Sequence, residues 1–201
     1  NIQRRARDPV TGKTYLVPAD MSYEQWRQSI ASKHGQNQIE VAEKQTRNEA
    51  ADRKQYEEFK TLIGSDVPKT FAKFQELKYT KAEEWAAMMR QVATFHKIET
   101  GPYSDEYKAK LKETYRYFRK DGYEFTIHAL NRVLGQKTGK GKRPFTREEL
   151  KEMFKKPPNY KQSDGKLVRY ENRIAIIQAP DTGEIVSVVA RDTISKNWEV
   201  I

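Results

Sequence analysis

The spacing of apolar residues changes along the chain from a helical period to a strand period. Residues 37–62 carry sparse apolar positions among charges of both signs, and residues 80–95 carry an apolar stripe at helical spacing. Beyond residue 166 the period becomes two, and residues 173–178 and 184–191 are the strongest strands. The APDTG turn between them is typical of a β-hairpin. Helices followed by antiparallel strands predict an α+β fold.

The best candidate for a linker is the segment 99–103, where a glycine and a proline adjoin. Ser104, which follows it, can cap a new helix. We therefore expect an extended helical module over residues 1–98 and a second domain over residues 104–201. In the second domain, helices are expected to pack on a four-stranded antiparallel sheet.

Composition narrows the classes of function. The net charge of +10 favours a polyanionic partner, with nucleic acid ahead of a membrane surface. The absence of cysteine excludes disulfides, a thiol nucleophile and Cys-ligated zinc. The three histidines are far apart and show no metal-binding spacing, so neither a metal nor another cofactor is expected. No apolar run approaches the length of a membrane span, and no membrane partner is expected. Because the chain begins without Met, we expect a fragment of a longer protein.

One predicted helix carries the candidate chemistry. Residues 123–135, YEFTIHALNRVLG, place Leu130 and Val133 on an apolar stripe. His128 and Arg132 lie one turn apart on another face, so their side chains are expected to be neighbours. Such a pair could place a proton-transfer group beside an anion-binding group. Taken alone, a partly buried histidine and a solvated arginine are the more common interpretation.

The second domain also offers hydroxyl groups and lysines near its end. Ser187 interrupts an apolar strand face, and Thr193 and Lys196 lie in the loop that follows. With His128 and Arg132, this set suits metal-independent cleavage of RNA. That reaction needs a base for the 2′-OH proton, an acid for the 5′-oxygen, and cations or hydroxyls around the charged phosphorane. Histidine can serve as base or acid, and the 2′-OH supplies the nucleophile that DNA lacks. Individually, Ser187 and Lys196 are more often a sheet hydroxyl and a surface lysine.

The first half of the chain resembles a phage structural protein. Residues 8–26, DPVTGKTYLVPADMSYEQW, and residues 59–79, FKTLIGSDVPKTFAKFQELKY, carry the resemblance. Together they make residues 8–98 similar to the C-terminal part of Mu F-like phage head-morphogenesis (minor capsid) proteins. The resemblance implies capsid or portal components as partners and a place in the phage virion.

The second half resembles a toxin domain. The motifs that carry it are HALNR at 128–132, KKPPN at 155–159, NRIAII at 172–177 and TGEIVSVV at 182–189. They make residues 104–201 similar to the barnase–EndoU–colicin E5/D–RelE-like (BECR) superfamily, whose phage-associated members are fused to such capsid proteins. The resemblance implies helices packed on a four-stranded antiparallel sheet. It also implies a ribonuclease without a metal cofactor, RNA and in particular tRNA as substrate, a cognate immunity protein as partner, and action in the bacterial cytoplasm.

Transferred residue by residue, the resemblance implies that His128 and Arg132 are active-site residues. Ser187 takes a strand position where relatives often have Thr, and the segment from Thr193 to Lys196 is expected to supply a last hydroxyl or lysine. The cation that completes the site stays open. The candidates for RNA contacts are Lys140, Lys142, Arg169, Arg173 and Arg191.

Two other functions remain as alternatives. An ADP-ribosyltransferase toxin would need an NAD pocket with a catalytic glutamate. Glu184 and Glu199 are available, but neither belongs to a convincing ExE motif. A non-enzymatic head protein would instead use its basic surface to contact packaged DNA, with binding that weakens steeply with salt.

Overall fold

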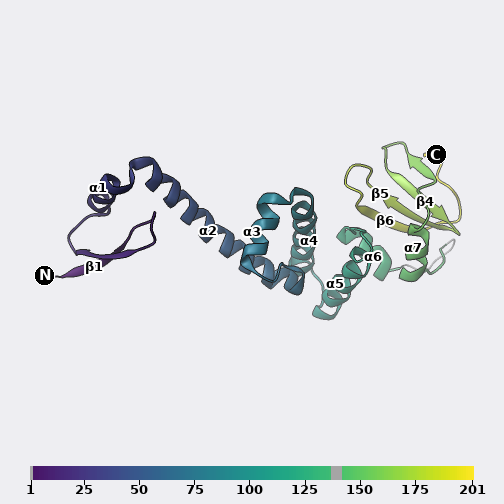
Figure 1. Cartoon of the computed structure of the whole chain (residues 1–201). Helices are drawn as coiled ribbons and strands as arrows, with labels where there is room; N and C mark the ends of the chain where they lie inside the picture. Colours follow the sequence, from purple (N-terminus) through teal and green to yellow (C-terminus); the bar gives the residue numbers. More distant parts are fainter. Residues whose placement is uncertain (1, 137–141) are drawn as a thin grey trace. The chain divides into compact units, whose positions relative to one another are not determined.

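The computed structural model describes residues 2–136 and 142–201 of the chain. Its contacts divide the chain into two units, Asn1–Ala82 and Glu83–Ile201 (Figure 1). This division lies one helix earlier than the predicted boundary at residues 99–103. Within the second unit, residues 99–100 belong to the last turn of a helix, and residues 101–103 form the turn to the next one.

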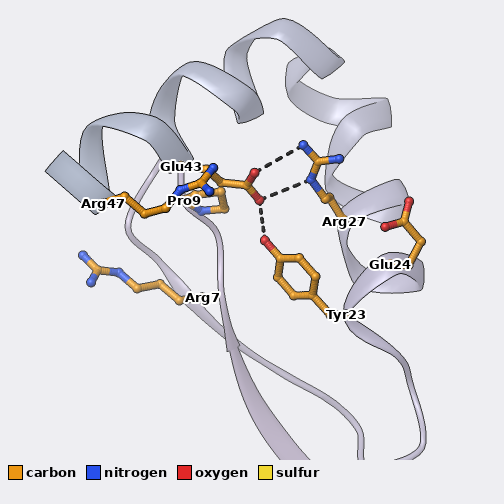
Figure 2. A pocket seen from close by; sticks show the side chains of 7 residues that line it. All are labelled: Arg7, Pro9, Tyr23, Glu24, Arg27, Glu43 and Arg47. Carbon is orange, nitrogen blue, oxygen red and sulfur yellow. Dashed lines mark hydrogen bonds and ion pairs between the residues drawn. The ribbon is translucent and has the colours of Figure 1, made fainter. Parts of the chain in front are cut away.

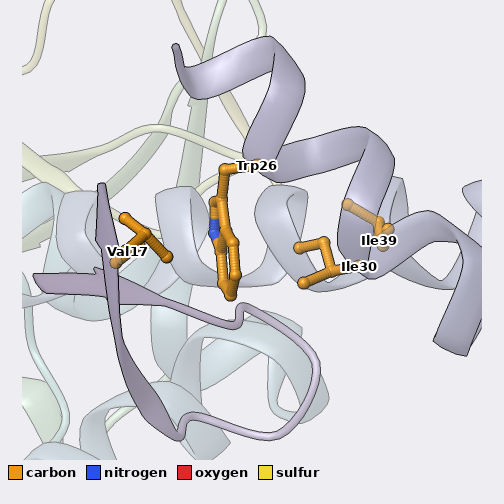
Figure 3. Packing of buried hydrophobic residues seen from close by; sticks show 5 residues of the cluster. Val17, Trp26, Ile30 and Ile39 are labelled. Atoms are coloured by element: carbon orange, nitrogen blue, oxygen red, sulfur yellow. The ribbon is translucent and has the colours of Figure 1, made fainter. Parts of the chain in front are cut away.

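A β-hairpin and a helix form the first core of the N-terminal unit. Strands β1 (Gln3–Arg7) and β2 (Thr14–Pro18) pair antiparallel. Helix α1 (Tyr23–His34) begins at a capping box of the type S-x-x-Q, formed by Ser22 and Gln25, which satisfies two main-chain N–H groups at its start. Burial of a tryptophan ring between the hairpin and the helices fixes their packing. The buried cluster consists of Ala6, Val17, Trp26, Ile30 and Ile39 (Figure 3).

A long polar helix leads to the second core of this unit. Helix α2 (Gln36–Ile63) has 28 residues, and at 1.5 Å per residue it is about 42 Å long. It ends at Gly64, whose φ of 61° lies in the region that favours glycine. The short 3₁₀ turn η1 (Gly64–Asp66) and helix α3 (Phe71–Thr80) follow. The buried side chains here are Tyr56, Phe59, Ile63, Val67 and Phe74.

Helices make up the first half of the second unit. They are α4 (Ala82–Thr100), α5 (Asp105–Arg119), α6 (Ile127–Leu134) and α7 (Arg147–Phe154). The last three begin at a side-chain cap, from Ser104, Thr126 and Thr146 respectively. Among the described residues, no helix is both long and apolar enough to cross a lipid bilayer.

An antiparallel sheet completes the second unit and confirms the α+β class. Its strands are β3 (Tyr160–Gln162), β4 (Leu167–Glu171), β5 (Ile174–Gln178), β6 (Ile185–Ala190) and β7 (Trp198–Val200). They lie in the order β6-β5-β4-β3-β7, with every neighbouring pair antiparallel. The sheet therefore has five strands, and the prediction of four was wrong. The missing strand was β3, because its three residues show no apolar alternation and, although it forms a short hairpin with β4, its pairing with β7 is non-local.

The two faces of the sheet have different neighbours. Helices α6 and α7 lie against one face (Figure 1), where the Arg169 guanidinium of β4 lies 5.4 Å from the centre of the Phe154 ring of α7. The opposite face carries aliphatic residues, which are covered by three aromatic rings. Its cluster consists of Tyr160, Val168, Tyr170, Ala175, Ile177, Val189 and Trp198.

A buried carboxylate ties α3 to α2 in the N-terminal unit. The Asp52 carboxylate accepts hydrogen bonds from Lys78 Nζ at 2.6 Å, the Tyr79 hydroxyl at 2.7 Å and the Gln75 amide at 3.4 Å. Burial raises the pKa of Asp52, but these bonds outweigh it and hold the pKa below its usual value. The ionised form of Asp52 is therefore the form that the fold stabilises.

Replacement of Asp52 by Ala is expected to lower the free energy of unfolding of the N-terminal unit by about 2 kcal/mol, because partly buried Lys78 loses its ion pair and keeps neutral partners such as Gln55. Since the folded-state pKa is lowered, this contribution is present above pH ~4 and is lost as the pH falls below it. Urea denaturation followed by circular dichroism between pH 7 and pH 2 measures both effects. Glu57→Ala, which removes an exposed ion pair with Lys60 from the same helix, is expected to change stability little. Equal losses in the two variants would contradict the role of Asp52.

Candidate functional site

The segment that leads into α6 is held by an edge strand. The helix predicted over residues 123–135 begins only at Ile127, because the residues before it are extended. The N–H of Ile185 in β6 donates to the carbonyl of Glu124 at 2.7 Å, and the N–H of Thr126 donates to the carbonyl of Ile185 at 3.0 Å. The Thr126 side chain then caps α6. The main chain thus places the first turn of α6 beside the start of β6.

A buried hydrogen-bond network lies at the start of this segment. The Tyr115 hydroxyl donates to the Glu124 carboxylate at 2.5 Å and accepts from Arg119 Nη1 at 3.0 Å. Arg119 also pairs with Glu124 and donates to the carbonyl of Ala87 at 3.2 Å. Burial, with the bond to Glu124, raises the pKa of Tyr115 well above its usual value. The network therefore fixes Glu124 in one orientation beneath the start of α6.

The predicted histidine–arginine pair is present on α6. Leu130 and Val133 are buried, whereas His128 and Arg132 are exposed. Arg132 Nε donates to His128 Nε2 at 3.4 Å, as expected for residues four apart on a helix. In this arrangement the Nε2 lone pair accepts the Arg132 hydrogen bond, and it becomes free to accept a proton when Arg132 turns to an anion. An imidazole that can act as a base therefore lies beside a guanidinium that can bind an anion.

A small hollow of about 100 Å³ lies beside Arg132 at the outer edge of β6. The bond from the Arg191 N–H to the Arg173 carbonyl sets the ladder between β6 and β5. By the alternation of an antiparallel pair, the main-chain groups of Val188 and Ala190 then point away from β5, towards this edge. The hollow is the size of one phosphate group and has cations around it. Its lining includes Arg132, Gln136, Lys142, Arg143, Val188 and Ala190.

One of these cations is held by an ion pair. Arg143 pairs with Glu149 through two N–H groups, and its Nε donates to the Asn172 carbonyl at 2.6 Å. The hydrogen bond to Glu149 raises the pKa of Arg143, and the same bond lowers the pKa of Glu149. Among the ion pairs of the described residues, none involves Arg132 or Lys142. These two cations therefore give the hollow its net positive charge.

Ser187 does not face this hollow. It pairs with Ile177 across β5 and β6, and residues directly opposite each other share a face of the sheet. Ile177 belongs to the aromatic-covered cluster with Trp198, on the face away from the helices. Ser187 is therefore a half-buried hydroxyl on that face, and the structure does not bring it to His128.

The connection from β6 to β7 carries three more candidates. The Arg191 guanidinium lies 4.7 Å from the centre of the Trp198 ring, and Arg191 Nε donates to the Thr193 carbonyl at 2.8 Å. Arg173 pairs with Asp192 of this connection. Thr193 and Lys196 are exposed. Among the described residues, no hydrogen bond or ion pair joins any of them to His128 or Arg132.

Arg173 and Arg169 have mainly structural surroundings. Arg173 follows Asn172 in the two-residue turn between β4 and β5, and both residues have positive φ, at 68° and 46°. Arg169 donates from Nε to the Lys156 carbonyl at 2.9 Å and from Nη1 to Gln178 Oε1 at 2.6 Å. Burial lowers the pKa of Arg169. Of the remaining candidates, Lys142 borders the hollow, and Lys140 lies outside the described residues.

Two features of the site were missed by the sequence analysis. Neither Arg143 nor the main-chain edge of β6 is among the features predicted from the sequence. The capping motif at Thr146 and Glu149 could have pointed to Arg143. The Thr146 side chain does accept from the Glu149 N–H at 3.1 Å, but the Glu149 carboxylate binds Arg143. No local signal marks the edge of β6.

The structure also shows where the residues needed for other chemistry lie, namely clusters of metal ligands and the two glutamates of the ADP-ribosyltransferase alternative. Among the described residues, no three His, Asp or Glu side chains lie close enough to share a metal ion. Glu184 immediately precedes β6 and Glu199 lies in β7, so the two belong to opposite edges of the sheet.

Comparison with protein-family models, curated proteins and solved structures found no match to the chain. The function of the site is therefore inferred from its geometry and its sequence.

Replacement of Tyr115 by Phe is expected to lower the free energy of unfolding of the second unit by about 1–2 kcal/mol at pH 7, because Glu124 and Arg119 lose a buried partner. Since the folded-state pKa of Tyr115 is raised, its hydroxyl stabilises the fold in full below pH ~10, and this contribution is lost as the pH rises further. Thermal unfolding followed by near-ultraviolet circular dichroism between pH 7 and pH 11 tests both points.

Tyr117→Phe is the matched control, because Tyr117 is a half-buried tyrosine of the same helix. It is expected to unfold like the wild type at pH 7. If Tyr115→Phe and the wild type lost stability in parallel above pH 10, the assignment of the alkaline sensitivity to Tyr115 would be wrong.

Proposed function

We propose that the second unit is a metal-independent endoribonuclease that cleaves RNA by attack of a 2′-OH group on the adjacent phosphate. The observation that carries this proposal is the exposed His128–Arg132 pair, joined at 3.4 Å, beside a hollow whose other cations are Lys142 and Arg143. Transesterification of RNA needs a proton acceptor and positive charge around one phosphate, and the nucleophile belongs to the substrate. A site of this composition can meet both needs.

Each residue has a defined task in this proposal. The scissile phosphate lies in the hollow, where Arg132 and Lys142 contact its non-bridging oxygens. With Arg132 on the phosphate, His128 Nε2 takes the 2′-OH proton while a water molecule protonates the leaving 5′-oxygen; alternatively, protonated His128 donates that proton and water takes the one from the 2′-OH. The products are a 2′,3′-cyclic phosphate and a 5′-hydroxyl. Arg143 keeps the rim of the hollow in place through Glu149.

The wider setting of this activity is also a proposal. Helices on one face of an antiparallel sheet are compatible with the architecture of the barnase–EndoU–colicin E5/D–RelE-like superfamily. In this setting the second unit is a toxin with tRNA among its candidate substrates and an immunity protein as its inhibitor. The N-terminal unit resembles a phage minor capsid protein and would carry the toxin in the virion. The site lies on the surface, where both RNA and an inhibitor can reach it.

His128→Ala is expected to slow RNA cleavage by the full chain by a factor of about 100 or more, because a general acid–base group is lost. Incubation with total tRNA in the presence of EDTA, followed by analysis of the RNA ends, measures the rate and identifies the products. His96→Ala removes an exposed histidine from α4 of the same unit and is expected to leave the rate unchanged. Arg132→Ala is expected to slow cleavage strongly, and Arg132→Lys less so.

Cleavage by the His128→Ala chain at the wild-type rate would remove His128 from the mechanism. Loss of wild-type activity in EDTA would contradict the metal-independent reaction. If the wild-type chain bound nucleic acid in a salt-dependent way and left it intact, the non-enzymatic alternative would replace this proposal. Consumption of labelled NAD would instead favour the ADP-ribosyltransferase.

A further inference from the structure

The N-terminal unit contains a larger hollow that the proposed nuclease does not use. It has a volume of about 570 Å³ and lies where the β-hairpin, α1 and α2 meet (Figure 2). This volume is within the usual range for sites that bind small organic groups. Polar and aromatic side chains from all three elements line it. They are Arg7, Tyr23, Glu24, Arg27, Glu43 and Arg47, with Pro9 beside them.

A fully bonded carboxylate lies at the centre of this hollow. Glu43 of α2 accepts two hydrogen bonds from Arg27 of α1, each at 3.2 Å, and a third from the Tyr23 hydroxyl. The bond from Tyr23 is the largest of several causes that lower the pKa of Glu43, and Arg27 adds to it. Glu43 is therefore ionised, and its charge is matched by Arg27. This cluster orients side chains without making the hollow acidic.

The same cluster fixes an exposed aromatic ring. The Tyr23 side chain is 61% exposed, yet its hydroxyl is held by Glu43. The hydrogen bond to Glu43 raises the pKa of Tyr23, so the hydroxyl stays protonated at neutral pH. A tyrosine has only two side-chain torsions, and this bond restricts both. The ring is thus a flat surface that loses little entropy when a second aromatic group stacks on it.

Two further arginines line this hollow outside the Arg27–Glu43 ion pair, and one of them, Arg47, lies near enough to Glu43 to help lower its pKa. Arg7 of β1 and Arg47 of α2 are exposed, and neither forms an ion pair within the described part of the chain. Figure 2 shows both on one side of the Tyr23–Glu43–Arg27 cluster, with Glu24 on the other side. A second hollow of about 600 Å³ shares Arg27, Glu43 and Arg47 with the first and is also lined by Glu40 and Asn48, so its two arginines are balanced by two glutamates. The positive side of the surface is therefore confined to Arg7 and Arg47.

We propose that this surface binds a single-stranded nucleic acid, with one base stacked on Tyr23 and neighbouring phosphates bound by Arg7 and Arg47. Aromatic rings beside arginines that follow a strand are the usual means of binding such strands without reading their sequence. Arginine matches the geometry of phosphate oxygens through paired N–H groups. None of these groups selects for the 2′-OH, so DNA and RNA are both expected to bind.

An acidic peptide fits the same surface less well. Its carboxylates could pair with Arg7 and Arg47, but a chain of carboxylates would leave the exposed Tyr23 ring without a partner. A nucleotide supplies a partner for each feature of the surface: a flat base for the Tyr23 ring, and an adjacent phosphate monoanion for the arginines. The site lies in a different unit from His128, so it does not depend on the nuclease.

Crosslinking to single-stranded DNA tests the proposal at the residue itself. The probe is a short oligodeoxythymidine with one 5-iododeoxyuridine, which the proposed transesterification cannot cleave because it lacks the 2′-OH. After irradiation of the full chain, mass spectrometry is expected to find the crosslink on Tyr23. The Arg7→Ala/Arg47→Ala double variant is expected to lose it. Arg5→Ala, which removes an exposed arginine from the same strand outside the hollow, is expected to retain it.

Measured binding affinities distinguish the contribution of base stacking on Tyr23 from that of the arginine charges. By fluorescence anisotropy with labelled oligodeoxythymidine, Tyr23→Leu is expected to weaken binding roughly tenfold, and Tyr23→Phe much less. With inorganic polyphosphate, which has no bases, Tyr23→Leu is expected to bind like the wild type, while the double arginine variant binds more weakly.

Three results would overturn the proposal. Crosslinks confined to the second unit would place nucleic-acid binding elsewhere. An equal loss in Arg5→Ala and in the double variant would mean that only overall charge matters. If Tyr23→Leu weakened polyphosphate and oligodeoxythymidine alike, Tyr23 would have a structural role and no stacking role.

Discussion

Two main-chain hydrogen bonds at one edge of the sheet determine the geometry of the candidate site. They join Ile185 of β6 to Glu124 and Thr126, at 2.7 and 3.0 Å. An edge strand exposes a row of N–H and C=O groups that need partners. The segment before α6 supplies hydrogen-bond partners for Ile185 alone. It then turns away from the strand, because Thr126 caps a helix at that point. His128 and Arg132 therefore lie beside the rest of the same edge.

The two hollows use the same arrangement of charge, although they belong to different units. In each, one arginine is matched by a glutamate, Arg143 by Glu149 and Arg27 by Glu43. These pairs fix the walls, and their charges cancel. In each hollow two further cations are left without such a partner among the described residues. Positive charge thus collects on a surface that the ion pairs keep in shape, as expected for a site that binds anions.

Local sequence signals predicted much of the fold. The capping box at Ser22 and Gln25, the glycine that ends α2 and the hairpin turn after β5 are all set by residues within a few positions of each other. The adjacency of His128 and Arg132 also follows from local helix geometry. These features could be read because the residues that cause them are neighbours in the sequence.

What the sequence could not show depends on distant pairing. Strand β3 lies inside the sheet because the distant strand β7 pairs with it, and residues 123–126 are extended because Ile185 pairs with them. Ser187 was expected at the site, but the register between β5 and β6 turns it to the opposite face. Tyr23 and Glu43 meet only after α1 and α2 have packed.

The most direct test of this account is amide hydrogen exchange in the full chain, measured residue by residue by nuclear magnetic resonance. If the edge of β6 holds the segment before α6, the amides of Ile185 and Thr126 will exchange as slowly as those in the centre of the sheet, such as Ile176. If both exchange at the rate of an unstructured chain while Ile176 stays protected, nothing holds α6 at that edge, and the proposed site loses its structural basis.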